Sequence, residues 1–294
     1  MTRTKSVCWT LLSVALAVML AASAANATLL INYKFDESPS GNTTATDSSG
    51  YSHTGTFALA PSRSTTDLPA LPGGNVSSVS LNNSAGNYVS TASASDLVSL
   101  RSMTIMMWVK DTPVPLGSGN SYPRIMEKIS STSGLLASFN LANNVVGLEL
   151  RASPSVDLSC NSTTYGTLTG WHNFAITWDG TYGGNSDNSG LVSFYLDGQL
   201  LGSPQVLTGT GLDVTPTETN PFTVANNTVT HNRALGNLFD DFRFYGSKTD
   251  GSGALTQAQI QELLVVPEPS ALMLVGIGMF GMIALRRFRH PSAR

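Results

Sequence analysis

The sequence predicts an all-β fold, a two-sheet sandwich or jelly roll. Short segments that alternate apolar and polar residues recur along the chain, separated by clusters of Gly, Asn, Ser and Pro. Charged residues make up only 12% of the chain, and Ser, Thr, Asn and Gly supply the turns that many short strands need. Only one segment before the C-terminal tail has the pattern of a helix. Many strands with a single terminal helix are typical of sandwiches and jelly rolls.

The predicted strands follow from the alternation. In the first, 29–35, Leu29, Ile31, Tyr33 and Phe35 share one face, because successive side chains of a strand point to opposite sides. The later predicted strands are 54–58, 76–81, 87–91, 103–110, 125–129, 135–141, 145–151, 171–178, 191–196, 222–225 and 238–245.

Two turns are predicted from their residues. Segments 76–81 and 87–91 form an expected hairpin around the polar stretch 82–86. Asp197-Gly198 is a tight hairpin signal, because glycine adopts a positive φ without strain.

The predicted helix follows residue 255. Thr256 and Gln259 have the spacing of a capping box, and Leu255 precedes it. Its apolar stripe consists of Ile260, Leu263 and Leu264.

The N-terminus has the three parts of a secretory signal peptide, predicted for residues 1–27. Arg3 and Lys5 are its charged region, 7–20 is its apolar region, and Ala25-Asn26-Ala27 is a small-x-small cleavage site. Cleavage after Ala27 is expected, with Ala22-Ser23-Ala24 as the alternative site. The sequence therefore predicts an exported protein.

The C-terminus also has three parts. Pro267-Glu268-Pro269 precedes the stretch 271–285, fifteen residues without a charge, and a basic cluster closes it. A helix over this stretch is about 22 Å long, which is less than the roughly 30 Å thickness of the hydrocarbon core. We therefore expect a thin, marginal transmembrane anchor. The cluster, which holds such a tail on the cytoplasmic side, consists of Arg286, Arg287 and Arg289.

This arrangement, predicted for residues 266–294, resembles the PEP-CTERM sorting signal of Gram-negative bacteria. The resemblance implies a transient anchor in the inner membrane, removal of the tail by an exosortase-type membrane protease, and delivery to the cell surface or extracellular matrix. An ordinary tail anchor is the alternative.

Charge and cysteine content limit the functions of the remaining domain, predicted as 28–265. Two basic residues lie in the signal peptide and four in the tail, so ten remain in 28–269 against nineteen acidic residues, a net charge of −9. This balance argues against a nucleic-acid partner, which needs a basic surface. Only Cys160 remains after processing, so no intramolecular disulfide forms, and we expect this thiol to be buried rather than nucleophilic.

Six motifs follow one another in a fixed order, at 35–36, 47–50, 171–180, 194–198, 222–225 and 239–245. This ordered set, over about 29–264, resembles the laminin G-like, concanavalin A-like jelly roll. The resemblance implies this fold and suggests carbohydrate or another extracellular partner. We expect core packing for Trp171 and Trp178, with sugar stacking as the alternative.

Asp240 is the most informative polar residue. In a regular strand it shares a face with Leu238, Phe242 and Phe244, so it should be buried. A buried carboxylate has to accept backbone N–H bonds, meet an arginine or bind a cation. Some members of the resembling family bind Ca²⁺ at a sheet rim. The resemblance extends this role to Asp240, together with Asp36 or Asp47, and no other cofactor is expected.

The sequence predicts no catalytic residues. Glycoside hydrolases on this fold usually place two carboxyl groups at alternating positions of one strand, and no predicted strand has that spacing. Asp36-Glu37 and Asp240-Asp241 are adjacent pairs, while Glu127 and Glu149 stand alone. Three hypotheses follow: a surface or matrix protein that binds glycans or other extracellular partners, a purely structural surface protein, and, least favoured, a glycoside hydrolase.

Overall fold

A computed structural model describes residues 27–37, 41–81, 86–116, 120–129, 134–152, 156–184, 190–207 and 220–265. The predicted sorting signal, and the predicted signal peptide up to Asn26, lie outside these residues. Within them, no helix is long and apolar enough to cross a membrane.

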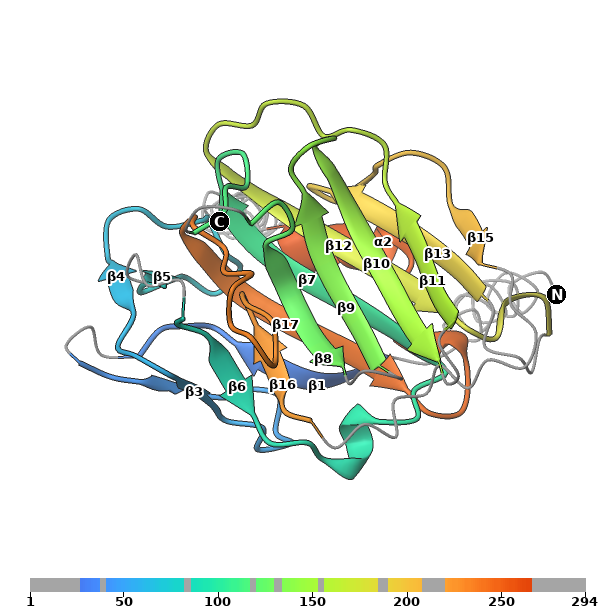
Figure 1. The fold of residues 1–294 in the computed structure, drawn as a ribbon, viewed down its shortest axis with the longest axis horizontal. Helices are drawn as coiled ribbons and strands as arrows, with labels where there is room; N and C mark the ends of the chain where they lie inside the picture. Colours follow the sequence, from blue (N-terminus) through green and yellow to red (C-terminus); the bar gives the residue numbers. More distant parts are fainter. Residues whose placement is uncertain are drawn as a thin grey trace, which may run out of the picture.

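The first layer is a nine-stranded sheet whose described strand pairs are antiparallel (Figure 1). β1 (Thr28–Tyr33) pairs with β17, and β15 (Gln205–Leu207) pairs with β13. The other strands follow the order β14 (Gln199–Leu200), β13 (Gly190–Leu196), β12 (Trp171–Asp179), β7 (Ser102–Lys110), β17 (Phe239–Ser247), β5 (Ser78–Ser80) and β4 (Ser62–Ser64).

The second layer is an eight-stranded sheet. In Figure 1 its long strands lie in front of β7, β12 and β13 of the first sheet. Its order is β11 (Val156–Asn161), β10 (Val145–Ala152), β9 (Gly134–Asn140), β8 (Arg124–Ile129), β16 (Phe222–Val224), β6 (Val89–Thr91), β3 (Gly55–Phe57) and β2 (Thr44–Ala45). The predicted all-β, two-sheet jelly roll is confirmed.

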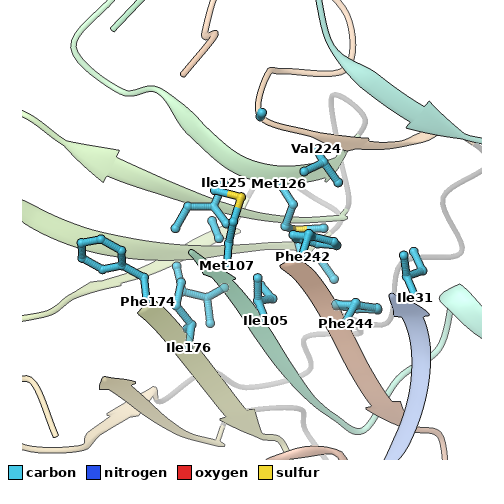
Figure 2. Packing of buried hydrophobic residues seen from close by; sticks show 14 of the residues in the cluster. Ile31, Ile105, Met107, Ile125, Met126, Phe174, Ile176, Val224, Phe242 and Phe244 are labelled. Atoms are coloured by element: carbon cyan, nitrogen blue, oxygen red, sulfur yellow. The ribbon is translucent and has the colours of Figure 1, made fainter. Parts of the chain in front are cut away.

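The main core fills the space between the two sheets. Phe242 and Phe244 of the first sheet face Met126 and Val224 of the second (Figure 2). Aromatic rings pack edge to face there: the centroids of Phe222 and Phe244 lie 5.0 Å apart at 61°. Apolar side chains at alternate positions therefore hold the layers together, as expected for a sandwich.

A smaller core covers part of the outer face of the nine-stranded sheet. The helix α2 (Gln257–Leu264) places Ile260 against this face, and Leu255 packs beside it. The predicted capping box is confirmed, because Thr256 accepts from the Gln259 N–H and the Gln259 side chain accepts from the Thr256 N–H. Three 3₁₀ turns complete the described helical elements: η1 (Ser95–Leu97), η2 (Tyr182–Gly184) and η3 (Gly251–Gly253).

One predicted turn is confirmed and one predicted hairpin is wrong. Asp197 and Gly198 have φ values of 51° and 73° and join β13 to β14. The expected hairpin of 76–81 with 87–91 does not form, because β5 pairs in the nine-stranded sheet and β6 in the eight-stranded sheet. Alternation identified both strands, but it does not specify which strand is the partner.

A bulge in β17 corrects the predicted position of Asp240. Asp241 has a φ of 45°, and the pairing with β7 shifts between Asp240 and Arg243. Asp240 is therefore opposite Trp108 on the outer face, whereas Phe242 points into the core. The expected shared face was wrong, but the expected burial is confirmed, since Asp240 is 0% exposed.

Candidate functional site

The outer face of the eight-stranded sheet carries polar side chains. Along β9, Ala137 and Phe139 point into the core, so Ser138 and Asn140 point outward. The same alternation directs Glu149 of β10 outward, because its neighbours in the strand lie in the core. A sheet with one apolar and one polar face thus presents hydroxyl, amide and carboxylate groups on one surface.

Two adjoining hollows lie over this surface. The first, about 330 Å³, extends over β9, β10 and β11, and the second, about 370 Å³, extends from β8 to the segment 227–233. They share three lining residues, Arg124, Leu136 and Arg233. We call the two hollows together the groove.

A glycine makes room at the first hollow. A Cβ on Gly147 would lie 2.7 Å from Asn161 Oδ1, closer than real Cβ contacts allow. Any larger residue at this position would displace Asn161 and narrow the hollow. Gly147 therefore keeps this end of the groove open.

Two carboxylates face the groove from β8 and β10, the two strands on either side of β9. Glu127 of β8 and Glu149 of β10 are both opposite Leu136 of β9. Glu127 Oε2 accepts from Arg124 Nε at 2.8 Å, and Glu149 accepts from Arg151. Sequence reasoning missed this pair because the two residues lie on different strands, and only the strand register brings them together.

The segment after β16 forms one wall of the groove. Asn226 Oδ1 and Asn227 Oδ1 accept from the Arg233 N–H at 2.8 and 3.1 Å. The Arg233 guanidinium lies over the ring of Tyr122, 5.6 Å from its centroid. These contacts hold Arg233 where the two hollows meet.

The three aspartates predicted for calcium have other partners in the structure. Asp47 accepts from the N–H groups of Asn32, Ser49 and His53 and from the Ser49 hydroxyl. Burial alone would raise the pKa of Asp47, but these hydrogen bonds lower it below its usual value. Asp47 is thus an acceptor that holds the turn after residue 46 against β1.

Asp36 and Asp240 lie near the segment that precedes β5. Asp36 accepts from the Val76 N–H at 2.7 Å, and Asp240 accepts from Asn75 Nδ2 at 2.7 Å and the Asp241 N–H at 2.8 Å. Burial raises the pKa of Asp240 to about 8, and the charges of Asp241 and Asp36 add to this effect. In the described residues no group of three or more His, Cys, Asp or Glu side chains could hold a metal ion. Asp36, Asp47 and Asp240 thus do not form such a group among the described residues, and calcium binding stays a prediction.

The two tryptophans and the cysteine considered in the sequence analysis lie at different places in the sandwich, and Trp171 does not pack in the core as expected. Trp178 lies in the core and Cys160 is a free, buried thiol whose pKa is raised by burial to about 12. Trp171 instead lies on the outer face of the nine-stranded sheet and donates to Asp67 Oδ1 at 3.0 Å. The two tryptophans are an odd number of residues apart, so one strand turns them to opposite faces.

Comparison with known families decides the classification. A laminin G-type family model, described as the concanavalin A-like lectin/glucanases superfamily, matches residues 83–261. The chain belongs to this superfamily. A second model, the PEP-CTERM protein-sorting motif, matches residues 265–289 and indicates an exported, sorted surface protein.

Solved structures share the superfamily fold at low sequence identity. Domain 4 of AbnA, a GH43 extracellular arabinanase from Geobacillus stearothermophilus in complex with arabinotriose, matches with a TM-score of 0.52 and 20% identity, over 82% of this chain and 100% of that domain. The binding domain of Paraclostridial Mosquitocidal Protein 1 matches with a TM-score of 0.54 and 10% identity, over 82% of this chain and 52% of that one.

A neurotoxin domain matches in the same way. The botulinum neurotoxin serotype G binding domain has a TM-score of 0.52 and 14% identity, over 80% of this chain and 50% of that one. The superfamily domain thus spans about half the length of both toxin binding domains. No curated protein matches the chain.

Proposed function

We propose that this protein is a cell-surface or matrix protein whose jelly roll binds carbohydrate in the groove. The observation that carries the proposal is the gathering of hydroxyl, amide and charged side chains around one open hollow on a sheet. A sugar presents many hydroxyls that both donate and accept, so a groove that offers both kinds of partner suits it. Ser138, Asn140 and Asn161 line the first hollow and supply such groups.

Sorting and structural likeness support the proposal in different ways. The PEP-CTERM motif supports processing by an exosortase-type protease at the inner membrane of a Gram-negative bacterium, followed by surface delivery. The similar arabinanase domain is in complex with arabinotriose, and interaction with two gangliosides is named for the type C neurotoxin. At these identities the likeness concerns the fold, so the ligand of this chain is argued from the groove itself.

We further infer that the groove binds glycan without cleaving it. Glu127 and Glu149 are two strand spacings apart, about 9–10 Å, near the separation used by inverting glycosidases. Each carboxylate is held by an arginine, so its oxygens are engaged within the protein rather than free to act on a glycosidic bond. Incubation of the protein with a bound glycan should release no reducing ends, and steady release would contradict this inference.

Glycan binding is tested by narrowing the groove. Gly147→Ala should weaken affinity for neutral polysaccharides such as arabinan by roughly tenfold, because an added methyl crowds Asn161 in the first hollow. Gly86→Ala is the matched control, since a Cβ there meets nothing within 4 Å. Affinity electrophoresis of the full chain measures both. If no glycan of a broad panel binds, the protein is a structural surface component instead.

A further inference from the structure

We propose that the groove selects polysaccharides that carry negative charge, and that Arg233 is the residue that recognises the anionic group. This inference rests on the proposed glycan binding and names the class of glycan. It is carried by the position of Arg233, by the charges around it and by the charge of the domain as a whole.

The structure holds Arg233 firmly at the junction of the two hollows. Its N–H donates to the side-chain oxygens of Asn226 and Asn227, and its carbonyl accepts from the Arg124 N–H at 2.9 Å. Its half-buried side chain rests on the Tyr122 ring. A guanidinium placed in this way loses little further freedom on binding, which favours affinity.

No carboxylate of the described residues pairs with the Arg233 guanidinium, in contrast to other arginines. Arg124 pairs with Glu127 and Arg151 pairs with Glu149, both at the groove. Arg63 and Arg243 likewise pair with Glu37 and Asp241. Arg233 therefore presents planar N–H donors to a ligand, in a geometry that matches carboxylate or sulfate oxygens in a bidentate manner.

The local charge favours an anion although the whole domain is acidic. Three arginines and two glutamates line the groove, whereas residues 28–269 carry ten basic and nineteen acidic residues. Most of the surface thus repels a polyanion, so polyanion binding has to come from a local site. For this reason, loss of one groove arginine should have a far larger effect than loss of a lysine elsewhere.

The test compares polymers that differ only in charge. Affinity electrophoresis of the full chain would measure its affinity for two polymers, polygalacturonate and the same polymer with its carboxyl groups reduced to alcohols. Both measurements are made in EDTA and a mild detergent. Binding to the charged polymer should be at least about tenfold tighter. Arg233→Gln should reduce this binding roughly tenfold to hundredfold, the range for one charged hydrogen-bonded contact, while Lys34→Gln, an equal charge change at an exposed site of the nine-stranded layer, should leave it unchanged.

Each outcome decides between the proposals. If the protein binds both polymers with equal affinity and Gly147→Ala weakens both, the proposed selection for charge is wrong and the proposed glycan binding stands. An equal loss in Arg233→Gln and Lys34→Gln would show diffuse electrostatics and overturn the role of Arg233. Tighter binding to dextran sulfate, with the same dependence on Arg233, would keep the anionic class and assign sulfate rather than carboxylate. Arg233→Lys, which keeps the charge without the planar fork, should bind with intermediate affinity. Unchanged affinity of Arg233→Gln for the carboxyl-reduced polymer would show that its loss of binding to the charged polymer is not caused by misfolding.

Discussion

At the scale of single residues, Asp240 has the most strongly shifted pKa among the carboxylates of the described residues. It is fully buried on the outer face of β17 and has two hydrogen-bond donors, Asn75 Nδ2 and the Asp241 N–H. These contacts lower its pKa, but desolvation outweighs them and raises it to about 8. Asp240 is thus a buried acid that is easily protonated near neutral pH, rather than a firmly ionised one.

The raised pKa of Asp240 predicts a pH dependence of stability. Between the ordinary aspartate value and about 8, the folded state holds a proton that the unfolded state has released, so stability should fall as pH rises through this window. In Asp240→Asn, urea unfolding between about pH 5 and pH 8 should lose this slope. The control Asp250→Asn should keep it, because the pKa of Asp250 is lowered by hydrogen bonds from Ser252 and Ser247. An unchanged slope in Asp240→Asn would contradict the prediction.

Removal of the Asp240 side chain tests its hydrogen bonds separately. Asp240→Ala removes the acceptor of the Asp241 N–H and the nearer acceptor of the Asn75 amide, which keeps only the Pro69 carbonyl at 3.3 Å. The variant should lower the free energy of unfolding by roughly 1–3 kcal/mol. Thermal or urea unfolding at a pH below 7 measures this loss, since Asp240 is then largely protonated. A variant as stable as the wild type would show that these bonds contribute nothing.

At the scale of elements, the sequence predicted what is local and missed what depends on register. The strands of the core, the capping box of Thr256 and the Asp197-Gly198 turn follow from neighbouring residues and were found as predicted. The bulge at Asp241 was missed, because one extra residue moves the following side chains to the opposite face of the sheet and the residue pattern does not indicate it. The groove was missed because strand partners cannot be predicted from alternation: only the pairing of β8, β9 and β10 places Glu127 and Glu149 on one surface, two strands apart.

The turn between β13 and β14 gives a prediction at this scale. Gly198 has a φ of +73°, and a Cβ there would lie 2.9 Å from Gln261 Cγ of α2. Gly198→Ala should therefore lower the free energy of unfolding through both backbone strain and crowding, by about 1–3 kcal/mol. Gly166→Ala has nearly the same φ, +72°, with nothing within 4 Å, so it measures the backbone cost alone. If urea unfolding shows an equal loss of unfolding free energy in the two variants, α2 accommodates the added methyl group at no cost.

At the scale of the whole molecule, the sorting motif and the folded domain lie next to each other along the chain. The superfamily match ends at residue 261 and the sorting motif begins at 265, directly after α2. Replacement of Pro267, Glu268 and Pro269 by alanine should leave an uncleaved, membrane-bound chain in a host with an exosortase, with the fold unchanged. Cell fractionation and the size of the chain on a blot measure this. Release of a shortened chain to the surface would show that the motif is not needed for sorting.

The last prediction concerns calcium and the closure of the fold. β1 begins the described chain and pairs with β17 near its end, so a cation between Asp36 and Asp240 would join the two ends of the domain. Calcium at a hundredfold excess over its dissociation constant would add about 2.7 kcal/mol to the free energy of unfolding. Such an effect would weaken below the raised pKa of Asp240, because protons would compete with calcium for its oxygens. Thermal unfolding in EDTA and in millimolar Ca²⁺, with Asp240→Asn as the variant that removes a ligand, measures the effect. Asp47 already accepts four hydrogen bonds, and among the described residues no group of three or more His, Cys, Asp or Glu side chains could hold a metal ion. We therefore expect no shift. A clear rise in the wild type that is absent from Asp240→Asn would establish the cation site instead.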